Sequence, residues 1–184
     1  IITHCSSAKK EVKQNYRATE NQVKVIEHGN YIDSYPNKIE KAEAREKLGL
    51  ETDRTVFLCF GQIRRYKGIP ELVEQFKKIE SEKAALIIHG SDRDTELTSE
   101  IKKKASEDSR IEVHDCFVPK EEVQIYMNAS DCIVLPYRKI TTSGTLVLAM
   151  SFDKPVLAPS KGCIPEYVNK KDSILFESTH KLTE

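Results

Sequence analysis

Short runs of β-branched and other apolar residues recur along the chain, and charged segments with helical spacing separate them. The runs that predict strands are residues 23–27, 55–60, 85–89, 110–114, 131–135 and 155–158. The segments that predict helices are residues 39–48, 69–80, 95–107, 120–128 and 143–151. Several runs are apolar throughout, which is typical of strands buried on both faces. The alternation predicts an α/β fold: a Rossmann-like parallel sheet with helices on both faces.

The first residues form a pattern of their own, with a short strand predicted at 1–5 and a helix at 7–16. They fit either the first βα unit of the same domain or the last βα unit of a preceding one. We favour the second, so that residues 1–21 are a remnant of a preceding unit with its linker and residues 22–184 are the Rossmann-like domain. The chain starts at Ile1 without a signal pattern, which indicates a fragment of a longer protein.

Composition excludes several classes of protein. Charged residues make up 32% of the 184 residues and balance to a net charge of zero, so no nucleic-acid partner is expected. The hydrophobic content of 39% is too high for a disordered chain. No apolar run approaches the roughly 20 residues that a membrane-spanning helix needs.

The chain has five cysteines and none of them belongs to a Cys-x-x-Cys pair. Four lie in or beside apolar, strand-like runs. This pattern predicts reduced and mostly buried thiols of a cytoplasmic protein, rather than disulfides or a metal site. We therefore expect no metal.

A basic loop follows the apolar strand predicted at 55–60. Gly61 allows the backbone to approach a ligand closely, and Arg64, Arg65 and Lys67 place three positive charges just before a predicted helix. Ligands of open α/β sheets bind beyond the carboxyl ends of strands, and cations beside a helix N-terminus favour phosphate. The loop therefore predicts a phosphate or diphosphate site, and the alternative is a solvated basic turn.

A second candidate follows the strand predicted at 131–135. Ser143 is of the N-cap type, and Gly144 and Thr145 open an apolar helix with free N–H groups. The alternative is a capped core helix without a ligand. Two anion sites at strand ends of one sheet favour a single diphosphate held from two sides, as transfer of a sugar from a nucleotide donor requires.

Five segments, in this order, resemble the C-terminal domain of the GT-B-fold glycosyltransferases, in particular the large retaining family 4. The resemblance runs from residue 1 to about residue 176. The segments are residues 25–31 (VIEHGNY), 60–68 (FGQIRRYKG), 86–90 (LIIHG), 118–136 and 143–166. The resemblance implies that the chain is the C-terminal, donor-binding half of a GT-B fold.

The resemblance also implies roles for single residues. It places Gly61 and Lys67 at the donor diphosphate, where many members have an Arg directly after the Gly. This chain has Gln62 there, and Arg64 is the expected substitute. The main chain around residues 117–118 is expected to meet the nucleobase, and the amides of residues 144–145 to hold phosphate or face the sugar. The predicted donor-binding residues are Gly61, Gln62, Arg64, Lys67, Phe117, Val118, Ser143, Gly144 and Thr145.

One departure from the family pattern concerns a pair of Glu residues eight positions apart around the donor helix. Ile140 and Leu148 occupy those positions here, and neither is acidic. Since the second Glu usually takes ribose hydroxyls, ribose recognition must differ in this chain. No catalytic residue is assigned.

The resemblance implies a nucleotide-sugar-dependent glycosyltransferase that acts on a polysaccharide or lipid-linked acceptor without a cofactor. The acceptor would bind to an N-terminal domain that this chain lacks, so we expect donor binding but little turnover. The expected location is the cytoplasm, with peripheral contact of the full-length protein at the inner face of the membrane. The alternative is a non-catalytic, glycosyltransferase-like nucleotide-binding or scaffold module. A GT-B epimerase or phosphorylase is a weaker rival, and a receiver-type signalling domain is disfavoured because no acidic cluster follows the strands.

Overall fold

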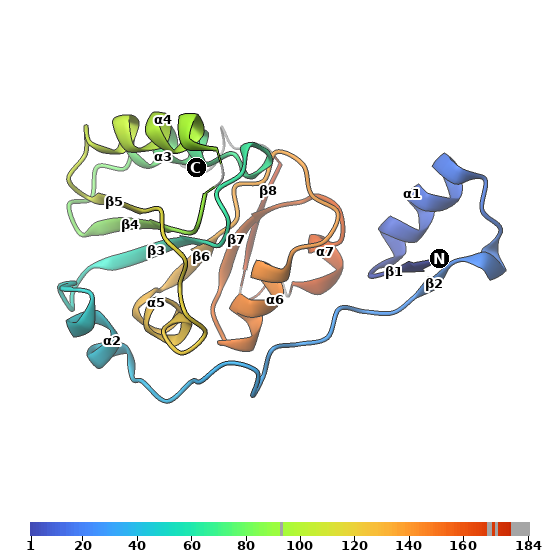
Figure 1. Ribbon diagram of the computed structural model, residues 1–184, viewed down its shortest axis with the longest axis horizontal. Helices are drawn as coiled ribbons and strands as arrows, with labels where there is room; N and C mark the ends of the chain where they lie inside the picture. Colours follow the sequence, from blue (N-terminus) through green and yellow to red (C-terminus); the bar gives the residue numbers. More distant parts are fainter. Residues whose placement is uncertain (93, 169–170, 172, 178–184) are drawn as a thin grey trace.

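A six-stranded, all-parallel sheet forms the main part of the chain (Figure 1). The computed structural model describes residues 1–92, 94–168, 171 and 173–177. The sheet order is β5-β4-β3-β6-β7-β8. The strands are β3 (Thr55–Phe60), β4 (Ala84–His89), β5 (Ile111–His114), β6 (Cys132–Val134), β7 (Val156–Pro159) and β8 (Ile174–Phe176). The predicted α/β class and parallel sheet are confirmed, and β8 is a strand that the pattern did not predict.

Helices cover both faces of this sheet, as the apolar strands predicted (Figure 1). One face carries α3 (Ile69–Phe76) and α4 (Thr95–Ala105). The other carries α2 (Lys41–Lys47), α5 (Val123–Ala129) and α6 (Gly144–Ser151). Each face has its own buried apolar cluster, and β4 is buried at all six of its positions. Within the described ranges, no helix is long and apolar enough to cross a bilayer.

The order of the strands reverses beside β3. The chain runs from β3 outward through β4 to β5, and then returns to place β6 on the other side of β3. At such a switch point the loops that leave the two central strands diverge and leave a crevice beyond their carboxyl ends. The loops after β3 and β6 hold the two segments predicted to bind phosphate.

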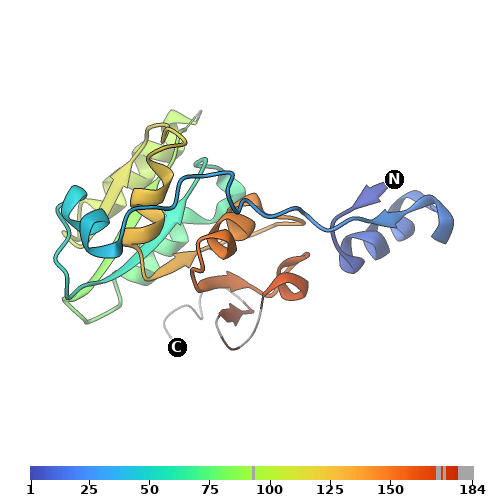
Figure 2. The same ribbon diagram turned by 90° about the horizontal axis from the view of Figure 1, so that it is seen from below.

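A small N-terminal unit lies at one end of the molecule (Figure 2). It consists of β1 (Ile2–Thr3), α1 (Ser6–Tyr16), the 3-10 helix η1 (Glu20–Gln22) and β2 (Lys24–Val25). β2 pairs in parallel with β1 in a separate two-stranded sheet, not with the large sheet. The predicted division at residues 21 and 22 falls within η1 and stays a prediction. The last residues of the predicted second domain, 178–184, lie outside the described residues.

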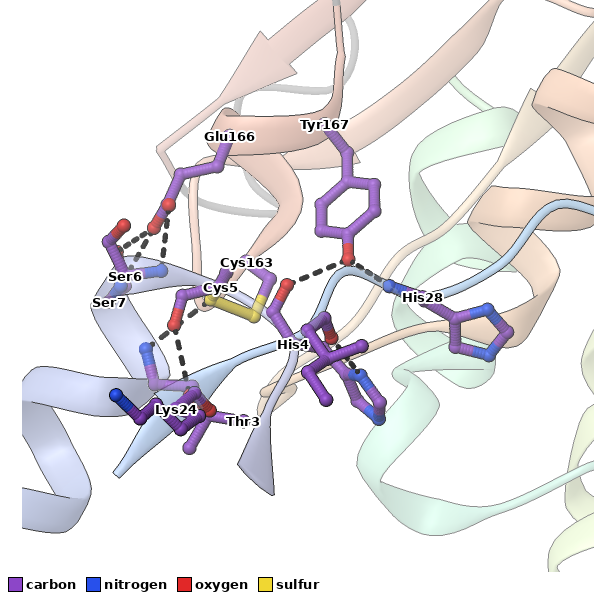
Figure 3. Close-up of a disulfide and its surroundings, with 12 residues drawn as sticks. Thr3, His4, Cys5, Ser6, Ser7, Lys24, His28, Cys163, Glu166 and Tyr167 are labelled. Carbon is purple, nitrogen blue, oxygen red and sulfur yellow. Dashed lines mark hydrogen bonds between the residues drawn. A yellow bond between two sulfur atoms is a disulfide. The ribbon is translucent and has the colours of Figure 1, made fainter. Parts of the chain in front are cut away.

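A disulfide joins this unit to the C-terminal part of the chain (Figure 3). Cys5 and Cys163 are 158 positions apart in sequence, and their Cα atoms are 5.5 Å apart. The expectation that all five cysteines are reduced is therefore wrong for these two. The spacing of the cysteines along the sequence does not predict this pair, because only the docking of the N-terminal unit brings the two residues together. The other three cysteines, Cys59, Cys116 and Cys132, are free.

Two side chains of α7 (Ile164–Tyr167) reinforce the disulfide (Figure 3). The Glu166 carboxylate accepts hydrogen bonds from the backbone N–H groups of Ser6 (2.9 Å) and Ser7 (2.8 Å) at the start of α1. The Tyr167 hydroxyl donates to the carbonyl of His4 and accepts from the backbone N–H of His28, both at 2.8 Å. The N-terminal unit is thus held by a covalent bond and a few polar contacts.

Candidate functional site

The loop after β3 folds back on the end of its own strand. Gly61 and Gly68 have φ of +91° and +68°, a backbone region that favours glycine, and the 3-10 helix η2 (Arg65–Lys67) lies between them. This turn returns the Lys67 ammonium to the carbonyl of Phe60, at 3.2 Å. Lys67 is only 5% exposed, and its burial lowers the pKa of the ammonium. A charged group with so little water around it gains strongly from an anionic partner.

Lys67 and Thr145 meet at Gly61, although they come from different loops. A Cβ atom added to Gly61 would lie 3.2 Å from the Lys67 Nζ and 3.3 Å from the Thr145 Oγ1. The two loops predicted to hold phosphate therefore face one another across a gap that only a glycine leaves open. The structure brings these three predicted residues together, while their binding of a diphosphate stays a prediction.

A second glycine makes this arrangement possible. A Cβ atom on Gly90, directly after β4, would lie 2.0 Å from the carbonyl oxygen of Gly61. The backbone N–H of Gly61 in turn donates to the carbonyl of His89, at 2.9 Å. The loop after β3 therefore depends on the missing side chain at position 90 for its path.

The first turn of α6 offers a ligand its backbone N–H groups more than its side chains. The Ser143 hydroxyl accepts from the backbone N–H of Leu146 (3.1 Å) and lies 2.8 Å from the Tyr137 hydroxyl. Ser143 is buried and acts as the N-cap of the helix, so its side chain is already engaged. Gly144 is exposed and Thr145 half-buried, which leaves the N-terminal amides of α6 open to a ligand.

Two side chains of the basic loop lie at its rim. Arg64 donates to the Gln62 Oε1 from Nε (3.3 Å) and Nη2 (3.2 Å), so the predicted substitute and the unusual Gln form a pair. Arg65 points elsewhere and forms an ion pair with Asp94, at 2.8 Å. Arg65 would have to break this ion pair to reach an anion in the site. Arg64 would not, because its described partner is the neutral Gln62.

A pocket of about 490 Å³ adjoins this loop and contains both residues predicted to meet the nucleobase. Phe117 is exposed at its rim, and Val118 is buried beneath it. The same pocket is lined by Gly61 and Gln62, so the phosphate loop and the base stretch share one cavity. Sequence reasoning missed three other lining residues, which come from the linker before α2: Tyr31, Ser34 and Tyr35. Lys120 and Val123 also line the pocket, and both belong to the segment 118–136 that carries the family resemblance.

A buried histidine lies behind the pocket. His89 is 2% exposed, its Nε2 lies 3.2 Å from the Cys116 sulfur, and its Nδ1 has no hydrogen-bond partner among the described residues. Burial, with a smaller contribution from His114, lowers the pKa of His89 to about 4, so the ring is neutral at pH 7. No group of three or more metal-binding side chains occurs in the described part of the chain.

Ile140 and Leu148 occupy the two positions where the family pattern has Glu. Both are apolar residues in apolar surroundings. Leu148 is 6% exposed and belongs to the apolar cluster under α6, and Ile140 packs against the same cluster. Neither position supplies a charge to the site.

Comparisons with known proteins give the family of the chain. The family model described as glycosyl transferases group 1 matches residues 54–184, which is most of the chain. A GDP-mannose:glycolipid 4-beta-D-mannosyltransferase of Xanthomonas campestris pv. campestris is 29% identical over 155 residues, which cover 83% of this chain and 42% of that protein.

Two solved structures share the fold. The structure of a glycosyltransferase from Rickettsia africae ESF-5 matches with a TM-score of 0.86 and 18% identity, over 99% of this chain and 50% of that one. The structure of Anabaena HepE in complex with UDP-glucose matches with a TM-score of 0.83 and 19% identity, over 99% of this chain and 51% of that one. The chain thus spans about half the length of the proteins it matches. On the family match, the chain belongs to the group 1 glycosyl transferases and forms a GT-B glycosyltransferase domain.

Proposed function

We propose that the chain is the donor-binding part of a nucleotide-sugar-dependent glycosyltransferase that acts on a polysaccharide or lipid-linked acceptor. The observation that carries this proposal is the meeting of the Lys67 ammonium and the Thr145 hydroxyl at Gly61, beside a partly aromatic pocket. A nucleoside diphosphate has matching parts, since its base suits the pocket and its diphosphate suits the cation and the amides. Membership of the glycosyl transferase family supports the same class of ligand.

The chemistry follows from the leaving group. In sugar transfer an acceptor hydroxyl oxygen forms a bond to the sugar C1 and loses its proton. The bond between C1 and the diphosphate oxygen breaks, and its electron pair stays on that oxygen. Lys67 and the N-terminal amides at Gly144 and Thr145 would stabilise the added charge on the leaving diphosphate. Bound phosphate would also raise the pKa of Lys67 again, against the effect of burial.

The relatives bear on the acceptor as well as on the donor. The name of the Xanthomonas protein gives GDP-mannose as its donor and a glycolipid as its acceptor, and the Anabaena structure holds UDP-glucose. Because the chain spans about half of such proteins, we place the acceptor on the remaining half. For the full-length protein we propose a cytoplasmic location with peripheral contact at the inner face of the membrane. In a reducing cytoplasm, which keeps most thiols reduced, Cys5 and Cys163 would lie side by side as thiols, and the disulfide would form under oxidising conditions.

Calorimetry with UDP, GDP and their sugars tests the proposal. The wild-type chain should bind at least one of them, and Lys67→Ala combined with Arg64→Ala should weaken that binding at least about tenfold through loss of charge-assisted bonds. Arg65→Ala is the matched control, because this neighbouring arginine is paired with Asp94 and should leave binding unchanged. Absence of wild-type binding at millimolar ligand, or unchanged binding by the double variant, would contradict the proposal.

The apolar Ile140 and Leu148 favour a second candidate, a nucleotide-binding module without catalysis. The full-length protein, assayed with a panel of nucleotide sugars, separates the two. Transfer that Lys67→Ala abolishes supports the enzyme. Donor binding without transfer or donor hydrolysis supports the module.

A further inference from the structure

A tyrosine of the linker between β2 and α2 lies along helix α6. The backbone N–H of Tyr31 donates to the Ser151 hydroxyl, at 2.9 Å, in the last turn of that helix. At the other end of the same helix, a Cβ atom on Gly144 would lie 3.4 Å from the Tyr31 hydroxyl oxygen. The side chain therefore runs from the C-terminal end of α6 to its N-terminal end.

The face of α6 under this side chain is defined by helical spacing. Residues 144, 148 and 151 are separated by four and three positions, which places them on one face of an α-helix. Tyr31 packs against the apolar cluster that contains Leu148. The phenol hydroxyl of Tyr31 thus lies at the start of this face, and Leu148, on the same face, is buried.

Two neighbouring aromatic rings contact the ring of Tyr31. Its ring is edge-on to Tyr35, with centroids 5.8 Å apart, and edge-on to His28, with centroids 5.7 Å apart. The Lys120 ammonium lies over the Tyr35 ring, 5.9 Å from its centroid. Aromatic contacts of this kind restrict the ring without using its hydroxyl. The hydrogen bonds described for Tyr31 likewise use its backbone N–H and carbonyl, not its hydroxyl.

Tyr31 borders both parts of the candidate site. Its ring lines the pocket that also contains Gly61 and Phe117, and its hydroxyl lies beside the first turn of α6. In a nucleoside diphosphate the ribose is the part that joins the base to the phosphates. A ligand with its base in the pocket and its phosphates at Lys67 therefore places its ribose next to the Tyr31 hydroxyl.

We propose that Tyr31 is a donor-binding residue whose hydroxyl forms a hydrogen bond with a ribose hydroxyl of the nucleotide. This inference rests on the proposed donor site and adds a contact from outside the loops that form it. A phenol serves here because it both donates and accepts, and because its ring packs against the apolar cluster that contains Leu148 while its oxygen reaches the ligand.

Calorimetry with Tyr31→Phe tests this contact, because the variant keeps the ring and removes only the hydroxyl. The ligands are GDP or UDP, whichever the wild type binds more tightly, its 2′,3′-dideoxy analogue, and inorganic pyrophosphate. Loss of one hydrogen bond should weaken binding of the ribonucleotide about three- to tenfold and leave the other two ligands unchanged. Tyr16→Phe, at an exposed tyrosine of α1 that does not line the pocket, is the matched control and should bind all three as the wild type does.

The outcomes separate this inference from the proposed function. Unchanged binding of the ribonucleotide by Tyr31→Phe would overturn the ribose contact and leave the donor site standing. Equal weakening of the ribonucleotide and the dideoxy analogue would also overturn it, since the hydroxyl would then act elsewhere. If the wild type binds neither nucleotide, both proposals are wrong.

Discussion

In the six-stranded unit, β4 is buried along its whole length and two large apolar clusters fill the space between sheet and helices. In the N-terminal unit, both strands have only two residues, and both positions of β2 are exposed. Its buried apolar side chains are few: Cys5, Ala8 and Val23. Burial of apolar surface stabilises the first unit, whereas the second depends on the disulfide and the polar contacts to α7.

The difference teaches how the candidate site is held. Lys67, Gly61 and Thr145 belong to the six-stranded unit, and its core fixes their positions. Tyr31 belongs to the linker that leads from the N-terminal unit, and the linker is anchored near its start by the bond from His28 to Tyr167. We therefore expect the phosphate end of the site to be insensitive to the docking of the N-terminal unit, and the linker end to respond to it.

The largest expected effect comes from removing the disulfide. Cys5→Ser combined with Cys163→Ser should weaken the docking of the N-terminal unit by about 2–4 kcal/mol, because the cross-link closes a long loop. Hydrogen exchange should then show fast exchange in β1 and α1 and unchanged protection in β4. Cys116→Ser, at an exposed free thiol, is the control. Equal loss of protection in β4 would show that the two units are one cooperative structure.

A smaller effect is expected from Gly90→Ala, which changes the six-stranded unit and leaves the N-terminal unit as it is. The added methyl group would overlap the carbonyl oxygen of Gly61, so the unfolding free energy should fall by about 1–3 kcal/mol. Nucleotide binding should fall with it, because the loop that carries Lys67 must move. Gly29→Ala is the matched control, since its Cβ would meet nothing within 4 Å. Denaturant unfolding and calorimetry measure the two effects, and wild-type binding by Gly90→Ala would contradict this account.

The smallest effect concerns pH and Glu166. Hydrogen bonds from Ser7, and then from Ser6, hold the pKa of this carboxyl at about 2, below its usual value. A depressed pKa stabilises the fold above the ordinary carboxyl pKa, and this contribution is lost as the pH falls from about 4.5 towards 2. Glu166 is exposed, so solvent screening limits the contribution to about 1 kcal/mol.

Compared with the wild type, Glu166→Gln should therefore weaken the docking of the N-terminal unit at pH 7. This difference from the wild type should become small near pH 2, where the wild-type carboxylate is protonated as well. Hydrogen exchange of the α1 amides across this range measures the change. Glu11→Gln, at an exposed position of α1 itself, is the control for altered charge. A difference between wild type and Glu166→Gln that stays constant down to pH 2 would show that the charge is not involved.

Much of the fold was predictable because its signals are local. The run at residues 55–60 is apolar from residue 56 onward, and β3 occupies those six residues. The short β8 at Ile174–Phe176 was missed, because three residues carry too little periodicity. The cysteine pattern misled, because the pairing of Cys5 with Cys163 depends on how distant segments dock.

The candidate site likewise contains residues that the sequence predicted and one that it did not. Gly61, Lys67 and Thr145 were predicted from their place after strands, since parallel strands bring their carboxyl ends to one edge. Tyr31 was missed because it lies in a linker without periodicity, and its place beside Gly144 depends on how the linker packs against α6.

The sequence by itself determined the alternation of strands and helices, the parallel sheet and the loops that follow its central strands, because each is set by nearby residues. The tertiary structure alone decided that the two loops meet at Gly61, that Gly90 must lack a side chain, and that Cys5 pairs with Cys163. It also decided which tyrosine reaches the start of α6. Contacts between residues far apart in the chain leave no periodic signal, so only the packed fold reveals them.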